Sequence, residues 1–357
     1  MTQRAKRLRP RLKAALCGAV MAMVCVFIAC DDLVYDDLSG CTDCTPTYTV
    51  RFTHTMNMSY ADAFAHYVQS VTLCAFTSDG VLAYTQTAPA DTLLAYDQSM
   101  DVADMPRGTY TLVAWAEGEE ATADCYTRPT LTVGSTTIDE LTCLLNRSYD
   151  SDGNAYIDHD LTPLFHGMVE NADLTELDYD GDRLVEVDLT KDTNVVRVVL
   201  QHLSGEDIDV DDFIFRITDS NGWLDYDNSL LADEELSYHP WSTYSGTASV
   251  GTDDEDDDAL TSVSVAIAEL TVNRLTPDSD TRLTVYNAYS GMRVLSIPVV
   301  DYALLVKGNY NSSLTDQEYL DRQDEYAMTF FLDESGSWIN TVIYINSWRV
   351  VLQDITM

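Results

Sequence analysis

The sequence predicts an all-β protein with two tandem β-sandwich domains, preceded by an N-terminal export signal and a short tether. Many short segments rich in β-branched and aromatic residues are separated by turn signals, whereas few segments have helical periodicity. About 328 of the 357 residues remain after the signal, which is enough for two separate cores. The hydrophobic content of 46% is ordinary for a globular chain, so the protein is acidic without being disordered.

The N-terminus has the pattern of a bacterial lipoprotein signal. Six basic residues lie within the first 13 positions, and the uncharged apolar run Ala14–Ala29 follows them. Phe-Ile-Ala-Cys at positions 27–30 resembles a lipobox, which predicts cleavage between Ala29 and Cys30 and acyl chains, such as palmitate, on Cys30. A plain secretory signal or a short transmembrane anchor is the alternative. The run has 16 residues, whereas a membrane span needs about 20.

The charge balance excludes one class of partner. Cleavage removes 6 of the 20 Lys and Arg residues and none of the 59 Asp and Glu residues, which leaves a formal net charge of −45. A surface this acidic repels phosphate groups, so we expect no nucleic-acid partner.

The cysteines leave several pairings open. An exported chain can form disulfides. Cys41 and Cys44 have the spacing of half a zinc site or of a redox motif, but no second Cys or His pair follows at zinc spacing. We therefore expect a local disulfide or two inert thiols there, and we expect no metal or cofactor. After cleavage, five cysteines remain besides Cys30: Cys41, Cys44, Cys74, Cys125 and Cys143.

The first half of the mature chain alternates strand and turn signals. Residues 30–46 form the lipidated acidic tether, and residues 47–160 form the first predicted sandwich. Ser-Asp-Gly at 78–80 predicts a hairpin turn. The predicted elements are a strand at Tyr48–His54, a helix at Ala61–Val68, hairpin strands at Val71–Thr77 and Val81–Thr85, and a central strand at Thr109–Ala116.

The second predicted sandwich spans residues 161–357, after a cluster of turn residues between Ser148 and Pro163. In its last strand, Trp348, Val350 and Leu352 share one face and are the candidate contact with another subunit. The predicted strands are Leu184–Leu189, Asn194–Leu203, Asp212–Thr218, Leu260–Leu275, Arg282–Asn287, Arg293–Val299, Glu325–Leu332 and Thr341–Leu352.

Acidic turns offer a weak indication of calcium. Asp150–Asn154 and Asp178–Asp182 resemble the start of a calcium loop, but both lack the Gly and the Glu that complete an EF-hand. We interpret them as solvated turns and Gly251–Asp258 as a charged loop, with weak calcium binding left open.

Catalytic motifs are absent from the sequence. The six histidines are scattered, and no nucleophile elbow, zinc helix or phosphate-binding loop is present, so we predict no enzyme and no catalytic residue. An aromatic set consisting of Trp223, Tyr226, Trp241 and Tyr244 could stack on a sugar, although packing within a Tyr-rich β protein is the favoured interpretation.

Several short strings, in their order and spacing, resemble the FimB-type family of fimbrial anchor lipoproteins from Bacteroidales-type bacteria. The resemblance covers nearly the whole mature chain and is densest from Cys30 to Gly80. The strings are Cys30–Leu38, Val50–Phe52, Asn57–Met58, Ala61–Phe64, Val71–Leu73, Phe76, Asp79–Gly80, Leu164–Gly167, Asn194–Leu200 and Ile345–Trp348.

The resemblance implies two transthyretin-like, Greek-key β-sandwiches and a structural role without catalysis. It implies a surface-exposed lipoprotein of the outer membrane, held by the lipid on Cys30, that binds fimbrial pilin subunits, attaches a fimbrium (pilus) and limits its length. The polymers of such families join by strand exchange, so we expect an uncleaved N-terminal strand and a subunit contact in Thr341–Ile355. The alternative for this segment is that it is only the last strand of the second sandwich, buried in its own sheet. The alternative is a glycan-binding surface lipoprotein of the same compartment.

Overall fold

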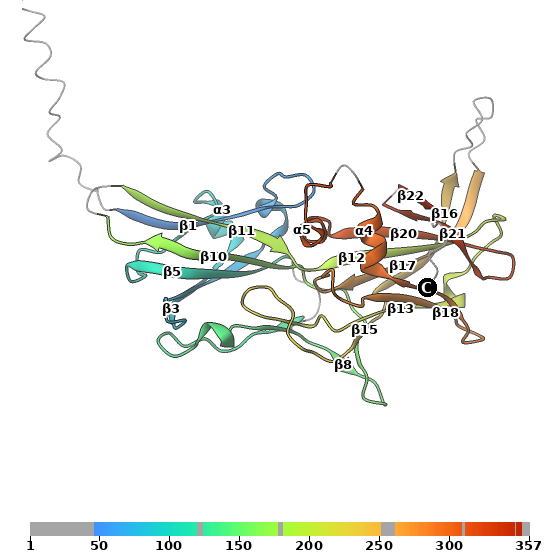
Figure 1. The fold of residues 1–357 in the computed structure, drawn as a ribbon, viewed down its shortest axis with the longest axis horizontal. Coiled ribbons are helices and arrows are strands. Elements are labelled where there is room, and N and C mark those ends of the chain that lie inside the picture. Colours follow the sequence, from blue (N-terminus) through green and yellow to red (C-terminus); the bar gives the residue numbers. More distant parts are fainter. Residues whose placement is uncertain are drawn as a thin grey trace, which may run out of the picture. The chain divides into compact units, whose positions relative to one another are not determined.

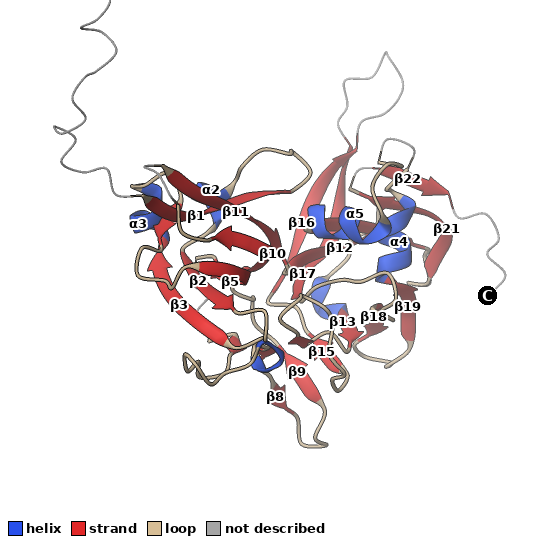
Figure 2. Ribbon diagram, turned by 60° about the vertical axis from the view of Figure 1, so that its left-hand side comes forward, coloured by secondary structure: helices blue, strands red, loops and turns tan. Residues whose placement is uncertain are grey.

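The computed structural model describes residues 46–119, 124–177, 181–250, 261–308, 311–346 and 348–351. The signal, Cys30, residues 31–45 and the acidic run at 251–258 lie outside them. Strands dominate and the helices are few and short, which confirms the all-β prediction (Figures 1 and 2). No described helix combines the length and the apolar character that a membrane span requires.

The first sheet has seven strands in the order β3-β2-β5-β10-β11-β1-β4 (Figure 1). Its pairs are antiparallel except β1 and β11, which run parallel. Successive side chains enter two different clusters, Leu73 and Leu112 on one side and Cys74 and Trp115 on the other. The strands are β1 (Thr47–Met56), β2 (Ser70–Phe76), β3 (Leu82–Pro89), β4 (Ser99–Asp101), β5 (Gly108–Glu117), β10 (Leu164–Leu174) and β11 (Asp182–Lys191).

The second sheet has six strands in the order β16-β17-β12-β20-β21-β22. Strands β12 and β20 pair in parallel and the others antiparallel. The strands are β12 (Asn194–His202), β16 (Ser242–Val250), β17 (Thr261–Val272), β20 (Glu325–Leu332), β21 (Trp338–Ile345) and β22 (Trp348–Val351).

The third sheet has six strands in the order β19-β18-β13-β15-β9-β8, and a small fourth sheet has the order β14-β7-β6. The third sheet contains β8 (Ser148–Tyr149), β9 (Ala155–Ile157), β13 (Phe213–Asp219), β15 (Leu236–Tyr238), β18 (Arg282–Asn287) and β19 (Arg293–Pro298). The fourth contains β6 (Tyr126–Thr127), β7 (Cys143–Leu145) and β14 (Trp223–Leu224).

The second and third sheets share one core, as the two layers of a β-sandwich do. Val198 and Phe330 of the second sheet belong to the same buried cluster as Ile217 and Val285 of the third. In each of these strands the buried residues alternate with partly exposed ones, which is the pattern that predicted the strands.

The helices are short connectors, drawn in blue in Figure 2. The first is shorter than the predicted helix Ala61–Val68, because the Asp62 carboxylate accepts hydrogen bonds from the backbone N–H groups of His54 and Phe64 and so holds the preceding turn. They are α2 (Phe64–Tyr67), α3 (Ala90–Leu94), α4 (Val299–Leu305), α5 (Asp316–Arg322) and the 3-10 helices η2 (Ile138–Glu140) and η3 (Val210–Asp212).

The sheets do not follow the predicted domain boundary between residues 160 and 161. Strands β8 and β9 precede it yet pair in the third sheet, whereas β10 and β11 follow it yet pair in the first. Strand β11 then leads into β12 of the second sheet through Asp192 and Thr193. The division at residue 160 stays a prediction.

Candidate functional site

The predicted subunit contact lies on an edge strand. Strand β22 is the last strand of the second sheet and pairs with β21, with Trp348 opposite Ile345 and Val350 opposite Ile343. Its other edge has no partner strand within the described part of the chain. Leu352 lies outside the described residues. An open edge presents unpaired N–H and C=O groups to another chain.

The single strand expected at Thr341–Leu352 is wrong, because the chain turns at Asn346 and forms two strands. Asn346 has a φ of 47°, a left-handed conformation that Asn tolerates better than most residues. Its N–H donates to the Ala327 carbonyl (2.9 Å) and its Oδ1 accepts from the Ala327 N–H (2.7 Å). Its Nδ2 also donates to the carbonyl of Glu325 (3.1 Å). Asn346 thereby fixes the β21–β22 turn to β20.

Strand β1 joins the predicted tether to the body. It pairs with β11 from Thr47 onward and with β4 from Thr49 to Arg51. Val50 and Phe52 are fully buried. Because β1 is bonded on both edges and filled with core residues, it is an integral strand of the sheet.

The end of β1 is held by side chains from two other elements. The Asp188 carboxylate of β11 accepts hydrogen bonds from the Thr53 hydroxyl (3.2 Å) and from the Thr55 N–H (2.7 Å). Arg322 of α5 donates to the Thr55 carbonyl (3.0 Å) and lies 4.4 Å from the centre of the Tyr60 ring. These contacts tie the N-terminal strand to a helix of the second half of the chain.

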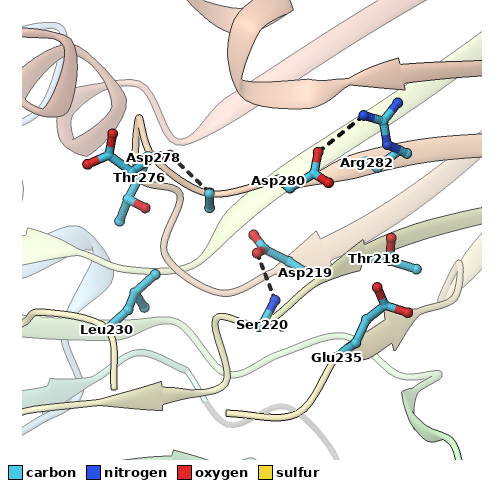
Figure 3. Close-up of a pocket in the computed structure, with 10 residues that line it drawn as sticks. Thr218, Asp219, Ser220, Leu230, Glu235, Thr276, Asp278, Asp280 and Arg282 are labelled. Atoms are coloured by element: carbon cyan, nitrogen blue, oxygen red, sulfur yellow. Dashed lines mark hydrogen bonds and ion pairs between the residues drawn. The ribbon is translucent and has the colours of Figure 1, made fainter. Parts of the chain in front are cut away.

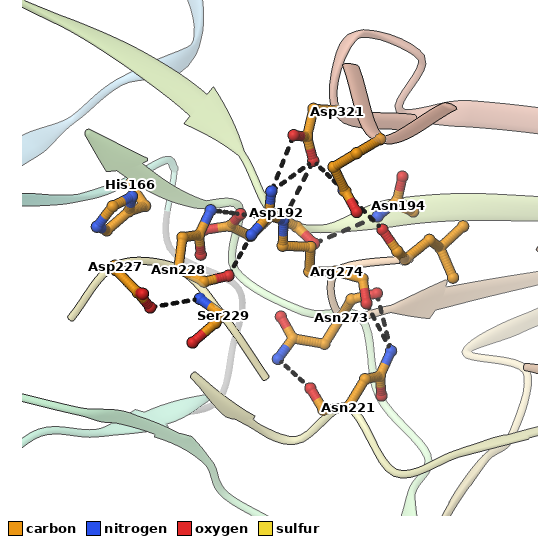
Figure 4. Close-up of polar contacts among 12 residues, drawn as sticks. His166, Asp192, Asn194, Asn221, Asp227, Asn228, Ser229, Asn273, Arg274 and Asp321 are labelled. Carbon is orange, nitrogen blue, oxygen red and sulfur yellow. Dashed lines mark hydrogen bonds and ion pairs between the residues drawn. The ribbon is translucent and has the colours of Figure 1, made fainter. Parts of the chain in front are cut away.

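A buried polar cluster lies where β11 passes into β12 (Figure 4). Arg274 follows β17 and donates to Asp321 of α5, with Nη2 2.8 Å from Oδ2 and Nε 3.1 Å from Oδ1. The same Nε lies 3.8 Å from Oδ1 of Asp192, which also accepts from Asn228 Nδ2 (2.8 Å). Lys191 pairs with Asp324 at 2.6 Å beside the cluster.

Burial shifts the titration of two groups near this cluster. Desolvation raises the pKa of Asp192 to about 7, although Arg274 and Asn228 oppose the shift. Desolvation lowers the pKa of His166 to about 4, and its Nε2 lies 2.8 Å from the Tyr226 carbonyl. These residues connect segments distant in sequence, and we interpret the cluster as a structural junction.

A polar groove crosses the solvent face of the third sheet. It consists of two cavities of about 540 Å³ and 650 Å³ that share Thr218 and Glu235. In Figure 3, the side chains of Thr276, Asp278 and Asp280 lie across the first cavity from those of Asp219, Ser220, Leu230 and Glu235. Thr218 and Arg282, which also line it, are paired residues of β13 and β18. The second cavity is lined by Asp150, Gly153, Asn154, Ala155, Tyr156, Asp158, Arg216, Thr218, Glu234, Glu235, Ser237 and His239.

The four predicted aromatic residues are not assembled into a platform. Trp223 lies on β14 of the fourth sheet, whereas Tyr244 lies on β16 of the second. Trp241, which precedes β16, and Tyr244 are each about 40% exposed. No ring contact joins these residues or Tyr226 to one another in the described structure.

The acidic turn at Asp150 is closed by its own hydrogen bonds. The Asp150 carboxylate accepts from the N–H groups of Asp152 and Asn154 (2.9 Å each) and from Asn154 Nδ2 (2.8 Å). The hydrogen bonds from Asn154 lower the pKa of Asp150. Residues 178–180 of the second acidic turn lie outside the described chain.

The described cysteines are buried. Cys74 and Cys143 form no disulfide, and desolvation raises the pKa of each thiol to about 11. Cys125 Sγ accepts a hydrogen bond from the N–H of Thr162 (3.3 Å). Cys41 and Cys44 are outside the described residues, so their pairing stays open.

Comparison with known proteins identifies relatives. The family model of fimbrillin-A associated anchor proteins Mfa1 and Mfa2 matches residues 41–354. A Bacteroides thetaiotaomicron structure provisionally described as polysaccharide binding is 30% identical, with a TM-score of 0.71, and the match covers 88% of this chain and 100% of that one. Another structure from that species, provisionally described as an adhesin, is 31% identical with a TM-score of 0.72. That match covers 87% of this chain and 100% of the other chain.

A more distant structure has the same fold. The fimbrial anchor protein Mfa2 from Porphyromonas gingivalis is 18% identical, with a TM-score of 0.61, and the match covers 86% of this chain and 99% of that one. A search of curated proteins found no match.

Proposed function

The chain belongs to the family of fimbrillin-A associated anchor proteins, and from this premise we propose that it attaches a fimbrium to the outer membrane as a surface-exposed lipoprotein. The family match over residues 41–354 is the observation that carries the proposal. It confirms the resemblance to fimbrial anchors and supports association with fimbrial subunits at the cell envelope.

The N-terminal end is the proposed membrane end. Acyl chains on Cys30 would hold the chain at the membrane, and residues 31–46 would link this lipid to β1. The core residues of β1 support this arrangement, because a strand that fills the sheet transmits the attachment directly to the body. Cleavage within β1 would release the body, so the proposed anchor keeps this strand.

The C-terminal edge is the proposed contact with a pilin subunit. Strand β22 has no partner on its outer edge within the described residues, and its Trp348, Val350 and Leu352 face would fill pockets of a partner sheet. A chain that holds the membrane at one end offers only its other end to a subunit. This asymmetry would end the polymer and so limit its length.

We also propose that the protein has no catalytic role. His54 Nδ1 lies 2.7 Å from the Leu189 carbonyl and His166 Nε2 lies 2.8 Å from the Tyr226 carbonyl, so both buried imidazoles contact backbone groups. These contacts are consistent with a structural role, and the anchor family that matches the chain is not a family of enzymes.

Replacement of the lipidated cysteine tests the anchor function. In Cys30→Ala, we expect loss of fatty-acid label and release of fimbriae into the medium, because the chain lacks its acyl chains. Metabolic labelling and immunoblots of cells and medium measure both effects. Cys74→Ala is the matched control and should leave label and attachment unchanged. Undiminished label, or fimbriae that stay attached to Cys30→Ala cells, would contradict the proposal.

Glycan binding is the second candidate function. A 30% identical structure is provisionally described as polysaccharide binding, and the third sheet of this chain carries an open polar groove. The groove rather than the dispersed aromatic residues is the observation that favours this function.

A further inference from the structure

A straight row of four side chains forms the floor of the groove on the third sheet. The strand register places Tyr156 beside Ser237, Ser237 beside Thr218, and Thr218 beside Arg282. All four are partly exposed, whereas the residues on either side of each along its strand are buried. Neighbouring strands lie about 4.8 Å apart, so the row from β9 to β18 spans roughly 14 Å.

The floor and its walls combine several kinds of hydrogen-bonding group. The row provides the phenol of Tyr156, the hydroxyl of Thr218 and the guanidinium of Arg282, whereas the Ser237 hydroxyl is buried and has no hydrogen-bond partner in the described structure. The walls add carboxylates and the amide of Asn154. The Tyr156 ring lies edge-on to the His239 ring at 5.7 Å and forms an aromatic end of the second cavity. Arg216, in the same cavity, has no ion-pair partner within the described residues.

We propose that this groove binds a short neutral or amino-bearing oligosaccharide laid across strands β9, β15, β13 and β18. Sugar hydroxyls both donate and accept hydrogen bonds, which suits a surface that alternates hydroxyl, carboxylate, amide and guanidinium groups. The Tyr156 end supplies an apolar ring face for a sugar ring. This inference deepens the second candidate function and does not depend on the anchor role.

The charge of the groove selects among ligands. Seven carboxylates line the two cavities, against Arg216 and Arg282, and the mature chain carries a formal net charge of −45. Anionic glycans are therefore repelled, whereas neutral sugars and amino sugars are not. A basic peptide would also suit the charge, although the floor is a sheet face and a peptide strand could not add to it by backbone pairing. Oligolysine is therefore included in the test as the competing ligand.

Titration with defined oligosaccharides tests the proposal. The probe set is neutral and amino-sugar oligomers of three to six units, with polygalacturonate as the anionic comparison and oligolysine as the basic peptide. The mature full-length chain carrying Cys30→Ser is used, so that the protein is soluble without lipid. We expect saturable calorimetric binding to at least one neutral or amino oligomer, and no binding to polygalacturonate or oligolysine.

Variants of the floor locate the site. Thr218→Val keeps the shape and removes one hydroxyl, and Tyr156→Ala removes the ring. Each should weaken binding roughly tenfold, as expected for the loss of one good contact. Tyr289→Ala is the matched control, because Tyr289 is 82% exposed and lies outside the groove. Circular dichroism and the melting temperature check that the variants fold.

Three results would overturn the proposal: no binding to any neutral or amino oligomer, preference for polygalacturonate or oligolysine, or unchanged affinity in folded Thr218→Val and Tyr156→Ala. Fimbrial attachment in cells that carry Thr218→Val is scored separately. It should remain normal, so failure of glycan binding and failure of anchoring give different results.

Discussion

Asp192 is a residue whose importance only the folded chain reveals. Its fully buried carboxylate forms an ion pair with Arg274, which follows β17, and accepts a hydrogen bond from Asn228 in a loop. Arg274 also donates to Asp321 of α5. In the sequence Asp192 is one of 59 acidic residues and carries no distinguishing pattern. The same holds for Asn346, because nothing local shows that its side chain caps a neighbouring strand. Such residues are defined by contacts between distant segments.

The pH dependence of stability should change in Asp192→Asn. The folded pKa of Asp192 is raised from 3.8 to about 7, so the stability it contributes is complete below pH 3.8 and is lost as the pH rises through about 7. As the pH rises from 3.8 to about 7, the free energy of unfolding of the variant should increase relative to that of the unchanged protein, by an amount on the order of a few kcal/mol. Urea unfolding at a series of pH values measures the difference.

His166 does not disturb that comparison. Its pKa is lowered to about 4, so its contribution is present above pH 6.5 and is lost as the pH falls through about 4, in both proteins alike. Asp150→Asn is the matched control: the pKa of Asp150 is lowered, so its contribution is lost toward acid. Parallel stability curves for Asp192→Asn and the unchanged protein would contradict the assignment.

Replacing Asn346 should destabilise the C-terminal turn. Asn346→Ala leaves the Ala327 N–H without its acceptor. It also puts alanine at a positive φ, which alanine tolerates less well than asparagine does. We expect a loss of about 2–4 kcal/mol in the free energy of unfolding. Asn346→Gly also loses the side-chain contacts but tolerates the φ, so its loss should be smaller by about 1 kcal/mol. Equal stability of Asn346→Ala and the unchanged protein would refute this role.

At the scale of elements, alternation of apolar and polar residues predicted most strands. Segments such as Asn194–Leu203 and Glu325–Leu332 coincide closely with β12 and β20. The pattern did not show the turn at Asn346, because the short Asn346-Ser347 signal lies between two segments rich in strand-forming residues. It also did not show which strands pair, since β8 and β9 join a sheet whose other members lie later in the chain. Pairing is decided by packing between distant segments, which one sequence does not display.

Disrupting β22 should separate folding from attachment. Val350→Asp together with Leu352→Asp adds charges to a strand in which Val350 lies opposite the fully buried Ile343 of β21, so folding has to be measured beside attachment. Fimbriae should detach, since charges replace apolar side chains at the proposed contact. Circular dichroism and the fraction of fimbriae in the medium measure the two effects. Val133→Asp, at an exposed residue outside the sheets, is the control.

The outcomes of this double substitution are distinct. Folded protein with fimbriae still attached would rule out β22 as the contact. Global unfolding would instead assign β22 to the core of the body.

The N-terminal strand should stay intact at the cell surface. Arg51 lies within β1, between β11 and β4, where the extended backbone is bonded on both sides and is a poor protease substrate. Mass spectrometry of surface material should therefore find peptides that span Arg51. A body that begins only after Arg51 would show that the strand is removed.

At the scale of the whole molecule, the sequence predicted the all-β class, whereas only the structure showed how the sheets are connected. The all-β class followed from strand signals and scarce helices, and the family strings pointed to the anchor family that the comparisons identify. The passage of β11 into β12 could not be predicted. Both segments read as ordinary strands, and the two residues between them give no sign that one sheet ends there.

The parallel pairing of β1 with β11 has a mechanical consequence. A lipid attached upstream would pull β1 by its N-terminal end, along the strand. Strand β11 runs in the same direction, with Asp182 opposite Thr47 and Thr190 opposite Met56. If force is applied to the N-terminal end of β1 and to the C-terminal end of β11, all hydrogen bonds between the two strands are therefore loaded in shear. These hydrogen bonds then break together rather than one after another.

Single-molecule stretching can measure this clamp. With one handle at the N-terminus and the other at Leu203→Cys, beyond β11 and β12, rupture should need a clearly higher force than with the second handle at Asp182→Cys. The latter handle lies beside Thr47 and peels the strands apart from one end. Equal rupture forces would refute the clamp. A higher force in the first geometry would mean that the fold resists the direction in which a cell-bound filament is dragged by flow.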